Sequence, residues 1–279
     1  MLIRTILMKL IYERTYDKVD QSMTDSQIGA RKKKSVRNHL FILNSILSDV
    51  MSSVKKESID LSIMDFRQMF DSEKLSTCLN AMYDAEIKDD MLALIYEANK
   101  TTYFAVKTPH GITEKTKISN KILQGDVLAP LLSSNMVDKY IGLPAMTSHN
   151  VYLYKNKVTI PPLTMQDDTL GISTCGYKSQ KMNSFMNTQT NLMGLQFGRD
   201  KCKTMHIGKK HRNEDICKDS KVDAWEDIVE NNELIDKYVG QEVMKKVEEK
   251  TYLGSIIQNN GKNDKNIQDR FNKAVGSVN

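Results

Sequence analysis

Apolar side chains recur along the chain at helix spacing in some segments and at strand spacing in others. From residue 36 to residue 50 they follow steps of four and three, which predicts an amphipathic helix with Ser35 as its N-cap. Residues 59–64 alternate between apolar and polar and predict a strand ending at Asp65. Apolar runs also flank Asp167 and Asp168, which predicts a turn between two strands at that pair.

The rest of the chain continues this mixture. Further helices are predicted over residues 73–85, 90–99, from 124 onward, over 179–193 and from 264 to the end. Hairpins are predicted from residues 101–107 with 113–118 and from 151–154 with 158–160, and strands over 204–207 and 252–257. Residues 209–250 are polar, look helical in places and look inserted. The expected fold class is α+β: an antiparallel sheet with helices packed on one face and the other face open for a substrate.

Composition limits the choice of protein class. With 279 residues, 40% hydrophobic and 27% charged, the chain is long and apolar enough to bury a core. The net charge of +5 permits a nucleic-acid partner without requiring one. Basic clusters at residues 31–34 and 209–212 contrast with an acidic stretch over 219–236, which favours a groove with a positive lining.

Cysteine usage and hydropathy suggest a compartment. The four cysteines show no Cys-x-x-Cys spacing and no secretory leader precedes them, so we expect a reducing intracellular compartment, nuclear or cytoplasmic. No apolar run reaches the roughly 18 residues of a membrane span. Cys202, His206 and Cys217 fit no standard zinc spacing.

Three aspartates carry the candidate chemistry. Adjacent carboxylates at Asp167 and Asp168 repel each other, and a divalent cation between them relieves that repulsion. Asp65 at the end of another strand would complete an all-oxygen magnesium site, the arrangement that phosphoryl transfer needs. The alternative is a solvated turn, since Asp is common in turns.

Ordered motifs surround these aspartates. Residues 27–35 (QIGARKKKS) look like Q-x-G-F-R-x-x-R-S, 64–71 (MDFRQMFD) like h-D-x-x-x-A-F-D, 124–131 (QGDVLAPL) like Q-G-x-x-L-S-P-h, and 165–168 (MQDD) like an aromatic-A-D-D box. Residues 194–201 (GLQFGRDK) and 252–254 (YLG) complete the series. Six motifs in this order resemble the reverse transcriptase domain of non-LTR (LINE-type) retrotransposons, over nearly the whole chain.

Several positions depart from the family pattern. Ala30 replaces an aromatic residue, Met69 and Gln166 replace alanines, Ala129 replaces a serine and Gly198 an asparagine. None of these removes a metal carboxylate, and together they indicate a diverged copy, truncated at both ends.

The resemblance implies domains and a metal site. Residues 1–57 would form partial fingers, 58–208 the palm with a fingers segment inserted at about 86–120, 209–250 a polar insert, and 251–279 a strand with the start of a thumb. Asp65, Asp167 and Asp168 would be catalytic and, with Phe66, would form the metal site for two Mg²⁺ ions, for which Mn²⁺ can substitute.

The resemblance also implies nucleotide contacts. Phe70 would lie under the incoming sugar, Gln124 and Gly125 near the template–nucleotide pair, and Lys201 near the leaving pyrophosphate. The alternatives are a core aromatic, a plain helix-start loop and a surface lysine.

Basic residues would bind the nucleic acid. Arg31, Lys34 and Arg37 would contact phosphates of an RNA template and DNA primer, with dNTP as the second substrate. The alternatives are a solvated charge run or a nuclear localisation signal.

Three functions follow from this reading of the sequence. The first is an RNA-directed DNA polymerase that transfers a nucleotide from dNTP to a primer 3′-hydroxyl. The second is a weak or inactive remnant that at most binds nucleic acid. A two-metal nuclease or phosphatase is a distant third, because it has no use for residues 124–131 or 252–254. With partial fingers and thumb, we expect weak primer–template binding and an exposed apolar patch. The oligomeric state stays open.

Overall fold

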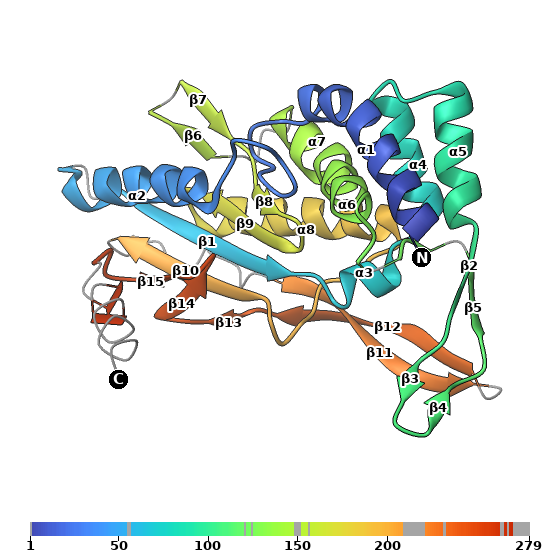
Figure 1. Cartoon of the computed structure of the whole chain (residues 1–279). Coiled ribbons are helices and arrows are strands. Elements are labelled where there is room, and N and C mark those ends of the chain that lie inside the picture. Colours follow the sequence, from blue (N-terminus) through green and yellow to red (C-terminus); the bar gives the residue numbers. More distant parts are fainter. Residues whose placement is uncertain are drawn as a thin grey trace, which may run out of the picture.

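The computed structural model describes residues 2–54, 57–119, 121–123, 125–147, 152–155, 157–208, 221–230, 233–262, 265–266 and 268–269 (Figure 1). The helices are α1 (Leu2–Ser22), α2 (Val36–Ser52), α3 (Met69–Ser72), α4 (Leu75–Asp84), α5 (Asp89–Asn99), α6 (Ala129–Val137), the π-helical η1 (Asp138–Gly142), α7 (Leu143–Met146) and α8 (Gly176–Met193). The strands are β1 (Ser58–Asp65), β2 (Thr101–Phe104), β3 (Lys107–Thr108), β4 (Gly111–Ile112), β5 (Thr116–Ser119), β6 (Tyr152–Tyr154), β7 (Val158–Ile160), β8 (Leu163–Met165), β9 (Asp168–Ser173), β10 (Lys203–Gly208), β11 (Lys221–Glu230), β12 (Glu233–Val243), β13 (Lys245–Lys246), β14 (Glu249–Tyr252) and β15 (Ser255–Gln258).

A central sheet organises the molecule. Its strands lie in the order β13-β10-β1-β9-β8. β1 occupies the middle and is antiparallel to both neighbours, with Leu61 opposite Met205 of β10 and Ile172 of β9. β8 and β9 pair as an antiparallel hairpin, and the short β13 runs parallel to β10. The predicted α+β fold with an antiparallel sheet is confirmed.

The two faces of the sheet pack against different helices. On one face, Leu61 and Ile63 of β1 belong to the same apolar cluster as Leu43 of α2. On the other face, the Oγ of Ser62 lies 3.1 Å from the Oγ of Ser179 on α8. This alternation follows from the two-residue period of a strand. Helix α2 therefore covers the face opposite to α8, so the expectation that this face is open for a substrate is wrong where α2 packs.

A helical subdomain packs beside the sheet on the α8 side. Helices α1, α4 and α6 share one apolar core with α8, to which Met64 at the end of β1 also belongs (Figure 1). The predicted helices over 73–85, 90–99 and 179–193 correspond to α4, α5 and α8. The helix expected from residue 124 onward begins later, at Ala129. Ser35 precedes α2 as predicted, and its backbone N donates to the Asn38 Oδ1 at 2.8 Å.

The predicted hairpins are present. β2 pairs with β5, and β3 with β4, so that residues 101–119 form one extended antiparallel arm. β6 pairs with β7 in the second hairpin.

The helical interpretation of residues 209–250 is wrong for the part that the structure describes. β11 and β12 form a long antiparallel ribbon instead, which runs along the lower edge in Figure 1. Val222 and Ala224 are buried at alternate positions, and Asn191 of α8 donates to Asp223 at 3.0 Å. This alternation has the two-residue period of a strand. Residues 209–220 and 231–232 lie outside the described residues.

The single strand expected over residues 252–257 is also wrong. β14 ends at Tyr252, and β15 begins at Ser255, its antiparallel partner. Leu253 and Gly254 both have left-handed backbone torsions, φ 47° and φ 76°, and these reverse the chain. Of the helix expected from residue 264, residues 265–266 and 268–269 are described, and they are helical.

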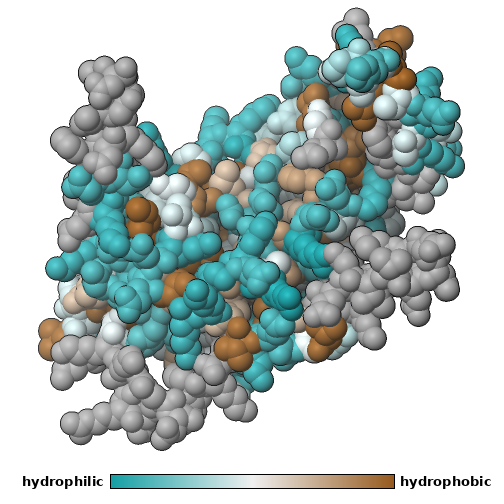
Figure 2. Space-filling model, turned by 90° about the horizontal axis from the view of Figure 1, so that it is seen from below, coloured by the Kyte–Doolittle hydropathy of each residue, from teal (hydrophilic) through white to brown (hydrophobic). Residues whose placement is uncertain are grey.

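None of the described helices is long and apolar enough to cross a membrane. Figure 2 shows that the lower face of the molecule is mainly hydrophilic, with apolar residues scattered in small groups.

Candidate active site at the end of the central sheet

Two of the three predicted aspartates face each other across the central strands. Asp65, the last residue of β1, is the direct antiparallel partner of Asp168, the first residue of β9. Asp168 also pairs with Met165 across the β8–β9 hairpin. The pairing of β1 with β9 therefore brings together two carboxylates that are far apart in the sequence.

Asp167 lies in the turn of the same hairpin. The turn consists of Gln166 and Asp167, and Gln166 has a left-handed backbone with φ 54°. A non-glycine residue in this region is uncommon and indicates a backbone held by its surroundings. The structure thus places Asp65, Asp167 and Asp168 at one end of the sheet.

The electrostatics of this end are dominated by negative charge. The pKa of Asp168 is raised, first because the carboxyl is half-buried and then because Asp167 and Asp65 are close. Lys250 and Lys201 oppose this shift but do not cancel it. An additional cation would therefore be stabilised here.

Lys201 contacts one of the three aspartates directly. Its Nζ lies 2.9 Å from the Oδ1 of Asp65, and this hydrogen bond raises the pKa of Lys201. Two backbone hydrogen bonds fix the position of Lys201. Gly198 N donates to the carbonyl of Asp65 at 2.9 Å, and Lys201 N donates to the carbonyl of Gly198 at 2.9 Å. The segment of residues 196–202 therefore wraps around the end of β1.

The two phenylalanines of residues 64–71 differ in their surroundings. Phe66 is buried, and its ring stacks on Phe197 with the centroids 4.7 Å apart. Phe70 is half-buried on the short helix α3. The Phe66 side chain thus holds the segment of residues 196–202 against the end of β1. Phe70 retains accessible surface near the same end.

The segment before α6 is only partly described. Gly125 is exposed with φ 84°, and a side chain added there would meet nothing within 4 Å. Gln124 lies outside the described residues. Asp126 accepts a hydrogen bond from Leu128 N at 3.0 Å and pairs with Arg4 of α1 at 2.8 Å, which ties this segment to α1.

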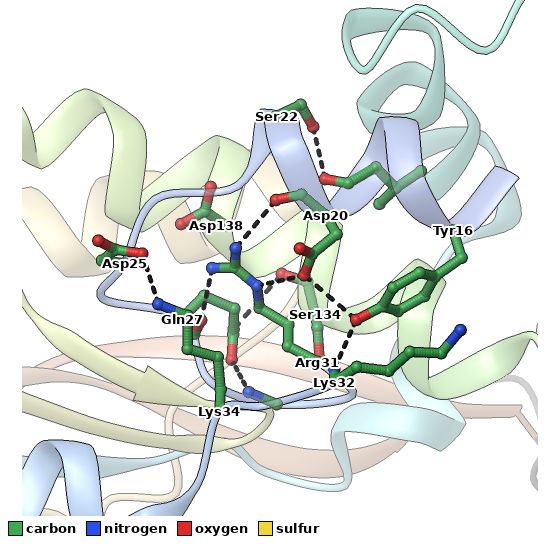
Figure 3. Close-up of polar contacts among 12 residues, drawn as sticks. Tyr16, Asp20, Ser22, Asp25, Gln27, Arg31, Lys32, Lys34, Ser134 and Asp138 are labelled. Carbon is green, nitrogen blue, oxygen red and sulfur yellow. Dashed lines mark hydrogen bonds and ion pairs between the residues drawn. The ribbon is translucent and has the colours of Figure 1, made fainter.

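The predicted phosphate-binding Arg31 points inward (Figure 3). Its side chain is 5% exposed, and its guanidinium contacts the Asp20 carboxylate at 2.7 Å and the Gln27 carbonyl at 3.0 Å. This geometry makes Arg31 a support of the loop between α1 and α2. A role for it in binding nucleic acid stays a prediction.

The other basic candidates are more accessible. Lys34 pairs with the exposed Asp25 at 2.7 Å, and Arg37 is exposed on the first turn of α2. The Lys32 ammonium lies 4.3 Å from the ring centroid of Tyr16. Lys32 and Lys34, but not Arg37, border an open groove of about 710 Å³ that also includes Val127, Pro130 and Gln166.

The three carboxylates supply the hard oxygen donors that Mg²⁺ prefers. Among the described residues, no three His, Cys, Asp or Glu side chains converge closely enough to hold a metal ion. The donor chemistry and the unbalanced charge at Asp168 fit a divalent cation, and Asp65 would exchange Lys201 for it.

Sequence reasoning gave no role to three residues that the structure places beside the site. Gln27 and Gly29 contact the Gln166–Asp167 turn, and Lys250 on β14 contributes positive charge near Asp168. Gln27 and Gly29 lie within the residue 27–35 motif, so a signal was present, but spacing alone does not show what they touch.

Comparisons with known proteins address the fold. The sequence matches no protein-family model and none of the curated proteins. The structure is similar to apo telomerase from Candida tropicalis truncated from its C-terminal domain, with a TM-score of 0.53 and 10% sequence identity over 74% of this chain and 41% of that one. It is also similar to apo telomerase from the same organism, with a TM-score of 0.52 and 10% identity over 73% of this chain and 37% of that one.

These similarities show a polymerase-type fold like that of reverse transcriptases, with a palm-like antiparallel sheet. At 10% identity they show the fold alone. The chain spans about two fifths of the length of the telomerases it matches.

Proposed function

We propose that this chain is the core of an RNA-directed DNA polymerase of the non-LTR retrotransposon type. The observation that supports this most is the pairing of Asp65 with Asp168 across β1 and β9, with Asp167 in the adjoining turn. Two-metal nucleotidyl transfer uses carboxylates to hold the ions, and this pairing supports that role for the three aspartates.

In this proposal the residues at the end of the sheet have different chemical roles. Asp65, Asp167 and Asp168, with Phe66 next to Asp65, would hold Mg²⁺ or Mn²⁺. When bound, two such ions lower the pKa of the primer 3′-hydroxyl and neutralise charge on the triphosphate. Lys201, which lies 2.9 Å from Asp65, would neutralise the leaving pyrophosphate.

The surroundings of the carboxylates suit a nucleic-acid substrate. The open groove beside Gln166 carries Lys32 and Lys34 at its rim and apolar residues such as Val127 and Pro130 in its wall. Cations bind backbone phosphates and apolar surfaces stack against bases. RNA template and DNA primer are the proposed ligands here, and dNTP would bind near Phe70 and Gly125.

A second candidate function is a remnant that binds nucleic acid without catalysis. The ion pair between Lys201 and Asp65 favours it, because Lys201 already neutralises a carboxylate that a metal would need.

Primer extension separates these candidates. The wild-type chain should extend a DNA primer on an RNA template with dNTPs and Mg²⁺ or Mn²⁺, and Asp65→Asn or Asp167→Asn should not. Asp60→Asn is the matched control, because Asp60 lies on the same strand but pairs with His206 at 3.0 Å. Absence of extension by wild type, with retained RNA binding, would support the remnant.

A further inference from the structure

One buried glutamine contacts the turn that carries Asp167. The Gln27 side chain is 0% exposed, and its Oε1 accepts from Gly29 N at 2.7 Å and from Gln166 N at 3.5 Å. Its Nε2 donates to the Ser134 carbonyl of α6 at 3.4 Å. A single amide thus connects the loop after α1, helix α6 and the carboxylate turn.

The backbone around Gln27 reinforces this connection. Ile28 N donates to the Thr164 carbonyl at 3.0 Å, and Thr164 N donates to the Ser26 carbonyl at 2.8 Å. Residues 26–28 therefore lie along the outer edge of β8, in parallel register with Gln27 beside Thr164. At this edge of the sheet, next to the Gln166–Asp167 turn, β8 pairs with the loop between α1 and α2 rather than with another strand.

Gly29 allows the loop and the turn to approach this closely. A Cβ at Gly29 would lie 2.8 Å from the Cγ of Gln166 and 2.9 Å from its backbone N. It would also lie 2.8 Å from the Oγ of Ser134. These distances are far below van der Waals contact, so a side chain at position 29 would displace the Gln166–Asp167 turn.

The opposite side of the loop is held by Arg31. Its guanidinium donates to the Gln27 carbonyl at 3.0 Å and is paired with Asp20 of α1 (Figure 3). Arg31 therefore fixes the backbone of Gln27, and the side chain of Gln27 accepts a hydrogen bond from the turn at Gln166. A movement of the loop would be transmitted to Asp167 through this contact.

We propose that Gln27 is a positioning residue for the Asp167–Asp168 pair, and that it couples the loop between α1 and α2 to the carboxylates. Its catalytic meaning rests on the proposed polymerase function. The geometric claim, that Gln27 sets the conformation of the turn, does not need that function to be correct.

The test uses Gln27→Met, which keeps the side-chain length and removes both polar atoms, and Gly29→Ala, which acts on the same turn by steric conflict. Asn99→Ala is the matched control, because Asn99 is a buried, hydrogen-bonded amide on α5. The full chain is measured by NMR for the amide resonances of Gln166 and Asp167, and by EPR for Mn²⁺ affinity.

Gln27→Met and Gly29→Ala should each shift the two amide resonances and weaken Mn²⁺ binding about tenfold, as loss of a group that supports metal ligands usually does. Asn99→Ala should lower stability without either effect. In an active enzyme, the Mg²⁺ concentration for half-maximal extension should rise in both turn variants.

Unchanged resonances and Mn²⁺ affinity in folded Gln27→Met would overturn the proposal. Should that variant fail to fold, Gly29→Ala decides by the same two readouts. A wild-type chain without polymerase activity would defeat the proposed function only, since the resonances of Gln166 and Asp167 still report on the role of Gln27.

Discussion

Asp65 at the end of β1 and Asp168 at the start of β9 are direct antiparallel partners, so two carboxylates approach each other by virtue of strand register. A shift of one residue in this register would turn one of them to the opposite face of the sheet. The pKa of Asp168 is raised first because its carboxyl is half-buried and then because Asp167 and Asp65 are close.

Replacing Asp168 by Asn should stabilise the metal-free protein near pH 7 and reduce primer extension at least about 100-fold. Burial, Asp167 and Asp65 raise the pKa of Asp168, so its ionisation lowers stability as the pH rises through that pKa. Urea unfolding at pH 7 and pH 3 measures this effect. Coinciding curves at pH 7 would contradict it, whereas coinciding curves at pH 3 are expected.

Glu73 should make the protein less stable as the pH rises towards 7. The carboxyl is 0% exposed, its Oε1 has no partner among the described residues, and burial raises its pKa to about 7 from 4.5. The contribution of Glu73 to the free energy of unfolding should therefore be highest below pH 4.5 and fall by about 3 kcal/mol by pH 8.

Glu73→Gln should lack this fall, because the amide cannot ionise and can still accept from the Ser133 hydroxyl, which lies 2.7 Å away in the wild type. Denaturant titrations of both proteins across pH 4–8 make the comparison. Parallel pH profiles for the two would show that Glu73 is not the responsible group.

His39 should have the opposite effect on stability: its contribution to the free energy of unfolding should decrease as the pH falls. Its Nε2 donates to the Ser26 carbonyl at 2.9 Å and its Nδ1 accepts from Tyr252 at 3.3 Å, so the ring is neutral. Burial lowers its pKa to about 4 from 6.5. Stability from this group is present above pH 6.5 and should fall by about 3 kcal/mol as the pH drops through 4. In His39→Gln the free energy of unfolding should decrease less below pH 6.5 than in the wild type. An NMR titration of the His39 ring in the wild type should give a pKa near 4.

The accessible basic residues should govern the salt dependence of RNA binding. Lys34→Ala with Arg37→Ala should reduce the slope of log affinity against log salt by about one to two. Lys178→Ala with Lys181→Ala on α8 removes the same charge elsewhere and is the control. Fluorescence anisotropy at several salt concentrations measures the slopes, and equal slopes for both pairs would reject a specific role for Lys34 and Arg37.

Helix α1 presents a row of exposed apolar residues that should promote self-association. Ile3, Ile6 and Leu10 are 83%, 51% and 52% exposed, at helical spacing. Replacing Ile6 and Leu10 by Lys should shift the chain towards monomer in light scattering at a given concentration. Leu192→Lys, an exposed leucine on α8, is the control. No change in either variant would remove α1 as the associating surface.

Much of this architecture could be predicted from the sequence, because local patterns encode local structure. The apolar spacing after Ser35 predicted α2, the alternation before Asp65 predicted β1, and the runs around Asp167 predicted the β8–β9 hairpin. The order of short motifs indicated a reverse-transcriptase-like palm, and the similarity to telomerase supports that fold.

Where local signals conflict, the sequence was misleading. Residues 209–250 were predicted to be helical in places, but residues 221–230 and 233–243 form strands, in which Val222 and Ala224 are buried. Tertiary packing determines the secondary structure here, because the alternating apolar residues Val222 and Ala224 stabilise a strand only when another surface covers them.

The sequence by itself determined which residues carry charge, which segments outside residues 209–257 are helices or strands, and which carboxylates stand at strand ends. The tertiary structure decided that Asp65 opposes Asp168, that Lys201 neutralises Asp65, and that Arg31 turns inward while Gln27 reaches the Asp167 turn. These contacts join residues far apart in the chain. They depend on strand register and on the space left by Gly29, which arise only when the elements pack together.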